Sequence, residues 1–451
     1  MKKIIIQDQT LIPPFNEPAR DLRIMNKPLW LYQRDVLSPY CQEELECKSF
    51  QEISSLPAHI LSGEVLVYRD NLFFDEFLFE EFITKARSLN QPAQIAFAKD
   101  DAAIVNHALL NLQSGIRLDG NVYVADLFYY PDGTVATTQR PQPVVIDTQP
   151  REIGYYRVPG YIDQQGDLVY QVPLRAFLSI ENWMHIFIAN GPFGIFAHGG
   201  RTEHSLEWSW SGGNILRNLK VLWRSLLERK QFLSSSALVV VGQNTQIDPT
   251  AVIQGPTIIG DNVFINPGAV IFNSVIGDNV TVMPGAQLLL SVVGNGSYLA
   301  FRSALFLTTL MENSMVAQNS CLQLCVIGRN TFIGAGNTFT DWNMLPNKPI
   351  RVLHQGQLRE AGLPIIGGCV GHNCRIGSGH IIFPGRSIDS DVVLVPKQGR
   401  TIITKNISYA DSDHLDYSGG GGHEIKYQED DAPFEKEADI EPAEQLVKSP
   451  T

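Results

Sequence analysis

The sequence predicts an α/β domain followed by a parallel β-helix, and three observations support this fold class. Short apolar segments alternate with a helical segment in the first 200 residues. Aliphatic residues then recur at a six-residue spacing between residues 241 and 394. An apolar segment with helical spacing joins the two regions. At roughly 100–200 residues per domain, a chain of 451 residues has room for both domains.

The first 200 residues contain three short apolar segments that we expect to be buried strands, Ile4–Ile6, Val65–Tyr68 and Ile95–Ala98. A helical segment, Phe77–Leu89, lies between the second and the third. This order is typical of a parallel sheet of the α/β class, whose ligands bind at the carboxyl ends of strands. Asp70 directly follows the second strand and is therefore predicted to bind a metal ion or a phosphate. The alternative is a capping or solvated turn residue.

The repeat is the most specific feature of the sequence. Ile259, Ile265 and Ile271 are six residues apart, and the same three-step pattern starts again at residues 276, 293, 310 and 327, each time after 17 residues. An amphipathic helix would repeat every 3.6 residues and a half-buried strand every two. A six-residue spacing instead fits a coil with three short parallel faces, each of which places one aliphatic residue inside. Residues 237–400 are therefore predicted to form a parallel β-helix.

The repeat is interrupted once. It stops at Asp341–Asn343 and resumes at Val370. The intervening loop, residues 344–369, contains Arg351 and His354. Because a regular solenoid gains no stability from so long an excursion, we expect the loop to contact a ligand. The alternative is a tolerated surface insertion.

Residues 201–236 form the linker between the two predicted domains. Ile215, Leu219, Leu222 and Leu226 recur there at helical spacing. We expect an amphipathic helix that covers the first open coil of the β-helix, and we prefer this interpretation to membrane association. Residues 401–451 are assigned to an acidic tail, which we expect to be disordered from about residue 411.

The chain has 47 acidic and 35 basic residues, which gives a formal net charge of −12. This acidity disfavours nucleic acid or an anionic membrane as a bulk partner. Residues 411–451 hold 12 of the acidic and three of the basic residues, so residues 1–410 carry a net charge of only −3. Phosphate-bearing ligands are therefore not excluded. Scattered cysteines and the lack of a long apolar segment lead us to expect a cytoplasmic protein with reduced thiols.

The repeat resembles the hexapeptide-repeat, left-handed β-helix family of acyltransferases and sugar-nucleotide enzymes. The resemblance implies a homotrimer in which acyl-coenzyme A, with acetyl-coenzyme A as the expected co-substrate, lies between neighbouring subunits. It also implies a histidine that acts as general base on the acceptor. The candidates are His354, His372 and His380, of which His372 is preferred because it directly follows the loop. The alternative for each is a polar corner residue.

The first region resembles the sugar-phosphate nucleotidyltransferases. Val65–Phe73 is similar to the segment in which an aspartate binds the catalytic Mg²⁺, and Asp70 occupies that position. Asn26–Leu29 and Glu181–Asn190 are similar to two further motifs, so Trp183 and Asn190 are expected to bind substrate. Ile6–Leu11 lacks the glycines and the arginine of the family's first loop. We expect three cations to replace them at the phosphates, or else to lie on a charged surface loop: Arg20, Arg23 and Lys27.

The bifunctional N-acetylglucosamine-1-phosphate uridyltransferase and glucosamine-1-phosphate acetyltransferase branch is similar in domain order. Ile12–Arg23 and Ile327–Thr338 resemble its motifs. The resemblance implies a Rossmann-like nucleotidyltransferase domain over residues 1–200, with Mg²⁺ at Asp70. It also implies transfer of a nucleotidyl group from a nucleoside triphosphate to a sugar 1-phosphate. One alternative is acyl transfer to an amino sugar around His372, with Arg351 and His354 binding substrate. Another is a non-catalytic scaffold that binds a sugar nucleotide.

Overall fold

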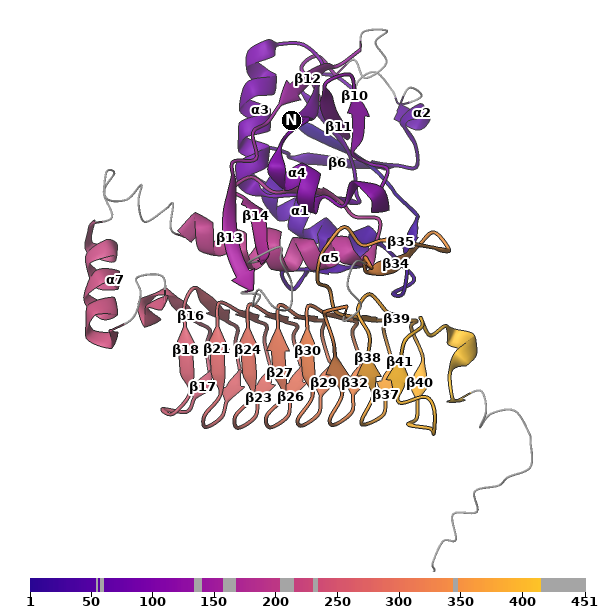
Figure 1. Cartoon of the computed structure of the whole chain (residues 1–451). Coiled ribbons are helices and arrows are strands. Elements are labelled where there is room, and N and C mark those ends of the chain that lie inside the picture. The colour runs from indigo at the N-terminus through magenta and orange to yellow at the C-terminus, as the bar shows by residue number, and fades with distance from the viewer. Residues whose placement is uncertain are drawn as a thin grey trace, which may run out of the picture.

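The structure is a computed structural model that describes residues 1–53, 56, 61–133, 140–156, 168–202, 215–229, 234–343 and 348–414. An α/β domain packs along one side of a long β-helix, and the chain returns from the β-helix to the α/β domain once (Figure 1). No helix in the described part is long and apolar enough to cross a membrane.

The α/β domain is built on a mixed sheet. Its strands lie in the order β12 (Gln142–Val145), β9 (Ala93–Ala98), β11 (Val122–Tyr130), β7 (Val65–Arg69), β1 (Lys2–Ile6) and β6 (Glu43–Cys47), with β10 (Arg117–Asp119) paired to β11. All three predicted strands are present, as β1, β7 and β9. The sheet is not purely parallel, because β11 runs antiparallel between β7 and β9.

Helices and short hairpins surround this sheet. The helices are α1 (Leu29–Leu37), α2 (Phe50–Ile53), α3 (Glu76–Leu89), α4 (Ala102–His107) and α5 (Trp183–Asn190), which continues into the π-helix η3 (Gly191–Phe196); η1 (Ala19–Asp21) and η2 (Leu110–Leu112) are 3-10 turns. The paired strands are β2 (Leu11–Ile12) with β3 (Glu17–Pro18), β4 (Arg23–Ile24) with β5 (Lys27–Pro28), β8 (Leu72–Phe74) with β15 (Phe177–Ser179), and β13 (Pro150–Tyr156) with β14 (Leu168–Pro173).

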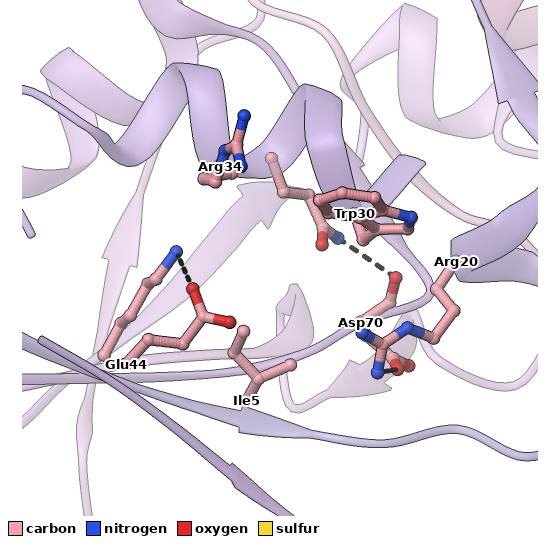
Figure 2. A pocket seen from close by; sticks show the side chains of 8 residues that line it. Ile5, Arg20, Trp30, Arg34, Glu44 and Asp70 are labelled. Carbon is pink, nitrogen blue, oxygen red and sulfur yellow. Dashed lines mark hydrogen bonds and ion pairs between the residues drawn. The ribbon is translucent and has the colours of Figure 1, made fainter. Parts of the chain in front are cut away.

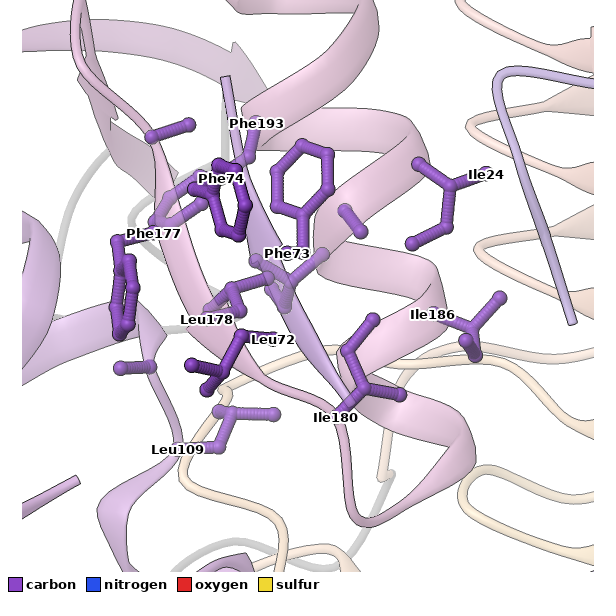
Figure 3. Packing of buried hydrophobic residues seen from close by; sticks show 14 of the residues in the cluster. Ile24, Leu72, Phe73, Phe74, Leu109, Phe177, Leu178, Ile180, Ile186 and Phe193 are labelled. Carbon is purple, nitrogen blue, oxygen red and sulfur yellow. The ribbon is translucent and has the colours of Figure 1, made fainter. Parts of the chain in front are cut away.

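The predicted helix Phe77–Leu89 is α3, and its ends follow from local chemistry. The carboxylate of Asp75 accepts a hydrogen bond from the Leu78 N–H and caps the first turn. Asn90 ends the helix in the left-handed conformation. The aromatic residues of β8 and β15 pack beside α5 in the hydrophobic core of the α/β domain, to which α3 also contributes (Figure 3).

The β-helix consists of three eight-stranded parallel sheets, so the chain completes eight coils. The first sheet contains β16 (Val239–Val241), β19 (Thr257–Ile259), β22 (Val275–Ile276), β25 (Val292–Val293), β28 (Thr309–Leu310), β31 (Val326–Ile327), β36 (Cys369–Val370) and β39 (Ser387–Ile388). The second contains β17 (Gln246–Ile247), β20 (Phe264–Ile265), β23 (Thr281–Val282), β26 (Tyr298–Leu299), β29 (Met315–Val316), β32 (Phe332–Ile333), β37 (Arg375–Ile376) and β40 (Val393–Leu394). The third contains β18 (Val252–Gln254), β21 (Val270–Phe272), β24 (Gln287–Leu289), β27 (Ala304–Phe306), β30 (Cys321–Gln323), β33 (Thr338–Phe339), β38 (Ile381–Ile382) and β41 (Ile402–Ile403).

The aliphatic residues of the repeat fill the interior of these coils, as predicted. Ile259, Ile265 and Ile271, one from each sheet, are all buried. The inward residues of successive coils stack into one continuous cluster that extends from the second coil to the last. The parallel β-helix predicted from the six-residue spacing is therefore confirmed.

Buried polar side chains form ladders along the corners of the coils. The Ser314 hydroxyl donates to the Gly328 carbonyl at 2.9 Å and accepts from the Thr331 N–H of the next coil at 3.1 Å. Residues that stack in this way form three ladders: Thr257, Ser274, Ser291, Thr308 and Cys325; Ser297, Ser314, Thr331 and Cys374; Ser320, Asn337 and His380. Each ladder satisfies backbone groups that the corner turns would otherwise leave buried without a partner.

The predicted loop joins the two domains. After β33 the chain leaves the β-helix and forms the hairpin of β34 (Arg351–His354) and β35 (Gln357–Glu360). Val352 and Ile366 from this loop are fully buried in the hydrophobic core of the α/β domain. Leu324 and Val326 of the β-helix belong to the same core. The loop is therefore not a surface insertion, and the two domains share one core.

The linker helix does not cover the first coil, so that prediction is wrong. Helix α7 (Ile215–Glu228) packs through Val221 against Leu238 of the 3-10 turn η5 (Ser236–Leu238). Val241 and Ile247 of the first coil remain 45% and 37% exposed.

Part of the predicted tail is ordered. Strand β41 and the 3-10 turn η6 (Tyr409–Asp411) lie within residues 401–414. Asp413 is buried there between Lys397, at 2.6 Å, and Arg400. Residues 415–451 lie outside the described residues.

Candidate functional site

Asp70 lies at the carboxyl ends of β1 and β7, where the sequence predicted it. Only 1% of the residue is exposed. Its Oδ1 accepts the Asp8 N–H at 2.7 Å, and its Oδ2 lies 3.3 Å from Nη1 of Arg20. Burial raises the pKa of Asp70 to about 6, although the Asp8 N–H and Arg20 both favour the charged form.

A cavity of about 210 Å³ opens beside Asp70, beneath α1 (Figure 2). Its lining residues are Lys3, Ile5, Arg20, Trp30, Gln33, Arg34, Glu44 and Asp70. Two of the cations are paired within or beside the cavity: Lys3 lies 2.7 Å from Glu44, and Arg20 lies 2.9 Å from Glu46. The cavity therefore carries little excess positive charge for a polyphosphate.

The residues around Asp70 do not fit the predicted Mg²⁺. Both carboxylate oxygens of Asp70 already have partners, and one of those partners is the cation Arg20. In the part of the chain that the structure describes, no three His, Cys, Asp or Glu side chains are placed to hold a metal ion. A hard cation such as Mg²⁺ needs free oxygen ligands. We therefore derive no chemical step through Mg²⁺.

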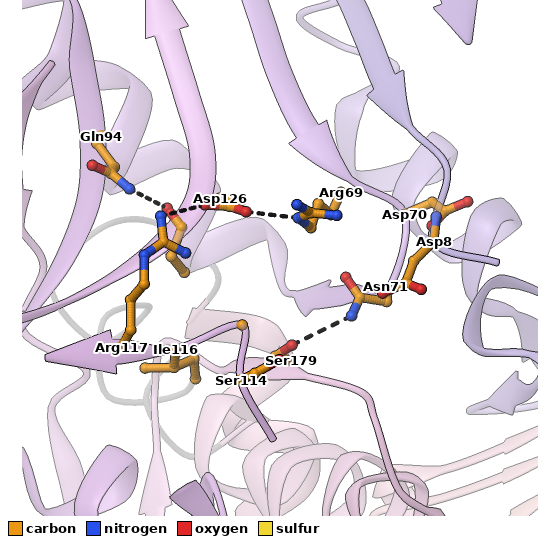
Figure 4. A network of polar contacts seen from close by, with 12 residues as sticks. Asp8, Arg69, Asp70, Asn71, Gln94, Ser114, Ile116, Arg117, Asp126 and Ser179 are labelled. Carbon is orange, nitrogen blue, oxygen red and sulfur yellow. Dashed lines mark hydrogen bonds and ion pairs between the residues drawn. The ribbon is translucent and has the colours of Figure 1, made fainter. Parts of the chain in front are cut away.

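A second buried carboxylate was not found from the sequence. Asp126 on β11 lies 2.6 Å from Nε of Arg69 and 2.7 Å from Nη2 of Arg117 (Figure 4). In the same network the Asn71 side chain donates to the Ser179 hydroxyl at 3.4 Å. The sequence signal was weak, because Asp126 lies in a predominantly apolar and aromatic segment without a motif.

Of the three cations predicted to hold phosphates, only Arg20 contacts Asp70. Arg23 lies 2.6 Å from Glu312 of the β-helix, and Lys27 lies 2.6 Å from Asp35 at the surface. Arg23 joins the two domains, and Lys27 belongs to an exposed ion pair. This arrangement agrees with the alternative of a charged loop for Lys27.

Trp183 and Asn190 are buried structural residues in α5. Trp183 is 1% exposed and is part of the hydrophobic core. The Asn190 carbonyl accepts the Met25 N–H at 2.7 Å, and its amide donates to the Arg23 carbonyl at 3.1 Å. Asn190 therefore fixes the β4–β5 segment, and neither residue lines a described cavity.

His372 is buried at the junction of the two domains. Its Nδ1 accepts the Arg329 N–H at 3.0 Å, and its Nε2 lies 3.6 Å from Oε2 of Glu17. Burial, followed by the nearby Arg329, lowers the pKa of His372 to about 3. The carboxylates of Glu312 and Asp391 raise that pKa by less than burial and Arg329 lower it, and Glu17 is already paired with Arg329. A general base of so low a pKa is inefficient near neutral pH.

The other two candidate histidines are also buried. His354 lies with Nδ1 3.4 Å from the Asn182 amide, and burial lowers its pKa. His380 is fully buried, with Nδ1 3.0 Å from the Gly377 carbonyl. Neither is placed to remove a proton from a substrate in solvent.

A larger cavity of about 600 Å³ lies between the hairpin and the last two coils. Its lining residues are Asn343, Lys348, Pro349, Ile350, Arg351, Leu358, Phe383, Pro384, Arg386 and Thr404. Lys348 and Arg351 are exposed, and Arg386 is half-buried. No described residue forms an ion pair with any of these three cations. Arg351 was predicted from the loop, whereas Lys348 and Arg386 were missed because no motif marks them.

Comparison with known proteins identifies the repeat. Residues 238–273 match the family model described as bacterial transferase hexapeptide (six repeats). The C-terminal region is a hexapeptide-repeat, left-handed β-helix. No curated protein matches the chain.

The chain is also similar to solved structures, of which 199 chains match. UDP-N-acetylglucosamine acyltransferase from Campylobacter jejuni is 14% identical, with a TM-score of 0.22, over 38% of this chain and 64% of that chain. A mutant of perosamine N-acetyltransferase from Caulobacter crescentus, in complex with CoA and GDP-perosamine, is 19% identical, with a TM-score of 0.16, over 36% of this chain and 50% of that chain. The chain thus spans less than two thirds of either protein.

Proposed function

We propose that the hexapeptide-repeat β-helix transfers an acyl group from a phosphorylated thioester of the acyl-coenzyme A type to the amine of an amino sugar. The observation that carries the proposal is the 600 Å³ cavity beside the hairpin, with three cations that form no ion pair among the described residues. The match of residues 238–273 to a transferase hexapeptide model supports this reaction class.

The lining of this cavity suits such a donor. Lys348, Arg351 and Arg386 would bind the phosphates, because charge-assisted hydrogen bonds to phosphate are the strongest available to these side chains. Phe383 and Leu358, which are 42% and 52% exposed, would pack against the apolar parts of the donor. The homotrimer implied by the family resemblance remains a prediction.

The same lining favours an amine over a hydroxyl as the acceptor. No histidine or carboxylate lines the cavity, so the described residues offer no base there. A neutral amine is already nucleophilic, whereas a hydroxyl needs a base to remove its proton. The amine nitrogen forms a bond to the thioester carbonyl carbon, the carbon–sulfur bond breaks, and the proton released from nitrogen leaves with the thiolate.

The test is free-thiol release from acetyl-coenzyme A with a panel of amino sugars and their phosphates. The double variant Lys348→Gln/Arg351→Gln should raise KM for the donor roughly tenfold with little change in kcat, since the lost contacts bind the donor equally in the ground and transition states. Arg375→Gln, an exposed arginine on β37, is the matched control. His372→Asn should leave kcat unchanged.

Two results would reject this proposal. One is the absence of thiol release with every amine. The other is a donor KM in Lys348→Gln/Arg351→Gln equal to that of the control. A loss of kcat in a folded His372→Asn variant would instead support His372 as the general base.

Nucleotidyl transfer at Asp70 is the second candidate function. The observation in its favour is a buried carboxylate at the edge of the sheet where ligands of α/β domains bind. The small cavity and the paired charges around Asp70 do not favour it. We therefore place it after acyl transfer.

A further inference from the structure

The apolar face of helix α7 is largely exposed in the part of the chain that the structure describes. Five large apolar residues on it are exposed by 40–67%: Leu219, Leu222, Trp223, Leu226 and Leu227. At 3.6 residues per turn they form one continuous stripe along the helix. Val221 and Ser225, on the opposite side, are the buried residues. The helix therefore packs against the protein through the side that carries Val221 and Ser225. Its apolar face has no partner among the described residues.

Cationic side chains border this stripe. At 3.6 residues per turn, Lys220 and Arg224 lie along one edge of the apolar stripe, and Arg229 lies along the other. All three are exposed and form no ion pair with a described residue. The one acidic residue of the helix, Glu228, accepts the Ser236 N–H at 3.0 Å and so faces the protein. Among the described side chains of α7, those on its exposed side are apolar or positively charged.

An exposed apolar helix face can bind a second copy of the chain or a lipid surface. The positive charge on α7 favours the lipid surface. A second copy of the chain would bring its own α7, and its cations, against these cations, which is unfavourable. An anionic lipid surface would instead attract them while its acyl region takes up the stripe, with Trp223 at the boundary. Helix α7 stands at the open end of the β-helix, apart from the α/β domain, so a flat surface can reach it (Figure 1).

We propose that α7 binds the surface of a membrane that contains anionic lipids, lying in the plane of the interface. The expectation against membrane association assumed that the apolar face covers the first coil, and the structure shows that it does not. Basic and acidic surfaces are then divided between two parts of one chain: the cationic helix, and the remainder with its net negative charge.

Flotation of the full-length protein with vesicles tests this proposal. The protein should float with vesicles of phosphatidylcholine that contain about a third phosphatidylglycerol, and much less with phosphatidylcholine alone. Leu226→Gln/Leu227→Gln should weaken binding at least roughly tenfold, because two exposed leucines no longer enter the lipid. Lys220→Gln/Arg224→Gln should weaken binding to the anionic vesicles by roughly fivefold per cation, and added salt should do the same.

Leu118→Gln, which removes a leucine that is 51% exposed on β10, is the matched control and should bind like the wild type. Equal binding to both kinds of vesicle, or no binding, would overturn the proposal. The mass in solution without lipid gives a further check. If Leu226→Gln/Leu227→Gln lowers that mass while the wild type ignores vesicles, the face is an interface between copies and the proposal is wrong.

Discussion

Asp70 shows how burial outweighs favourable partners at a single residue. Two partners stabilise its charged form, the Asp8 N–H and Arg20. Its pKa is nevertheless raised to about 6, because removal of the carboxylate from water costs more than these contacts return. A carboxyl group with such a pKa changes its charge close to physiological pH.

The raised pKa gives a signed prediction for stability. Because the folded pKa exceeds the unfolded value, the contribution of Asp70 to stability is fully present below about pH 4 and is lost as the pH rises through about 6. Asp70→Asn does not titrate, so it should gain up to about 2 kcal/mol over the wild type between about pH 4.5 and 7.5. Urea unfolding at both pH values measures this difference. A constant difference across the range would contradict the raised pKa.

The same variant separates the two candidate functions. Nucleotidyl transfer at Asp70 would release pyrophosphate from a nucleoside triphosphate and a sugar 1-phosphate, and Asp70→Asn would abolish that release. Acyl transfer at the β-helix should be unaffected.

Single residues were predictable from the sequence only where their neighbours in the chain determine their position. Asp70 lies at the end of its strand because the apolar residues before it form β7. The contacts of Arg23 and His372 could not be predicted, because their partners Glu312 and Glu17 come from the other domain. His372 is buried because the two domains pack together there. The sequence around His372 does not show that packing.

At the scale of elements, the corner ladders explain why polar residues recur inside an apolar solenoid. His380 continues a ladder that Ser320 and Asn337 begin. His372 accepts the N–H of the preceding coil at its corner, as Asp261 and Asp278 do at theirs. Both histidines therefore stabilise corners, in agreement with the alternative stated from the sequence.

Loss of one ladder hydroxyl should measurably destabilise the β-helix. Ser314→Ala removes the acceptor of the Thr331 N–H and the donor to the Gly328 carbonyl, and both groups are buried. We expect a loss of about 1–3 kcal/mol in the free energy of unfolding, measured in guanidinium chloride. Ser378→Ala, at an exposed corner, is the control. A loss no larger than that of the control would show that the ladder does not contribute.

Elements were predicted well where one period determines them. The six-residue spacing identified the coils, and the helical spacing identified α3 and α7. The direction in which α7 faces could not be predicted, because periodicity defines an apolar face without naming its partner. The hairpin of β34 and β35 was missed for a similar reason, since its buried residues form no repeat of their own.

At the scale of the whole molecule, we expect the shared core to make the two domains unfold as one cooperative unit. Leu324 of the β-helix is fully buried in the core of the α/β domain. Leu324→Ala should therefore lower the stability of the whole chain by about 2–5 kcal/mol. Calorimetry should show a single transition that moves to lower temperature.

Phe301→Ala, at a residue that is 47% exposed, is the control and should change stability by less than about 0.5 kcal/mol. Two transitions, only one of which moves in Leu324→Ala, would mean that the domains unfold independently.

The path of the chain through this core also constrains the order of synthesis. Residues 1–202 emerge from the ribosome first, but their core is completed by residues 307–369, which emerge much later. At roughly 5–20 residues per second, the unfinished α/β domain exposes apolar surface for several seconds or longer. During that interval the nascent chain offers a binding surface to chaperones. The insertion of the hairpin closes that surface only when the sixth coil is already complete.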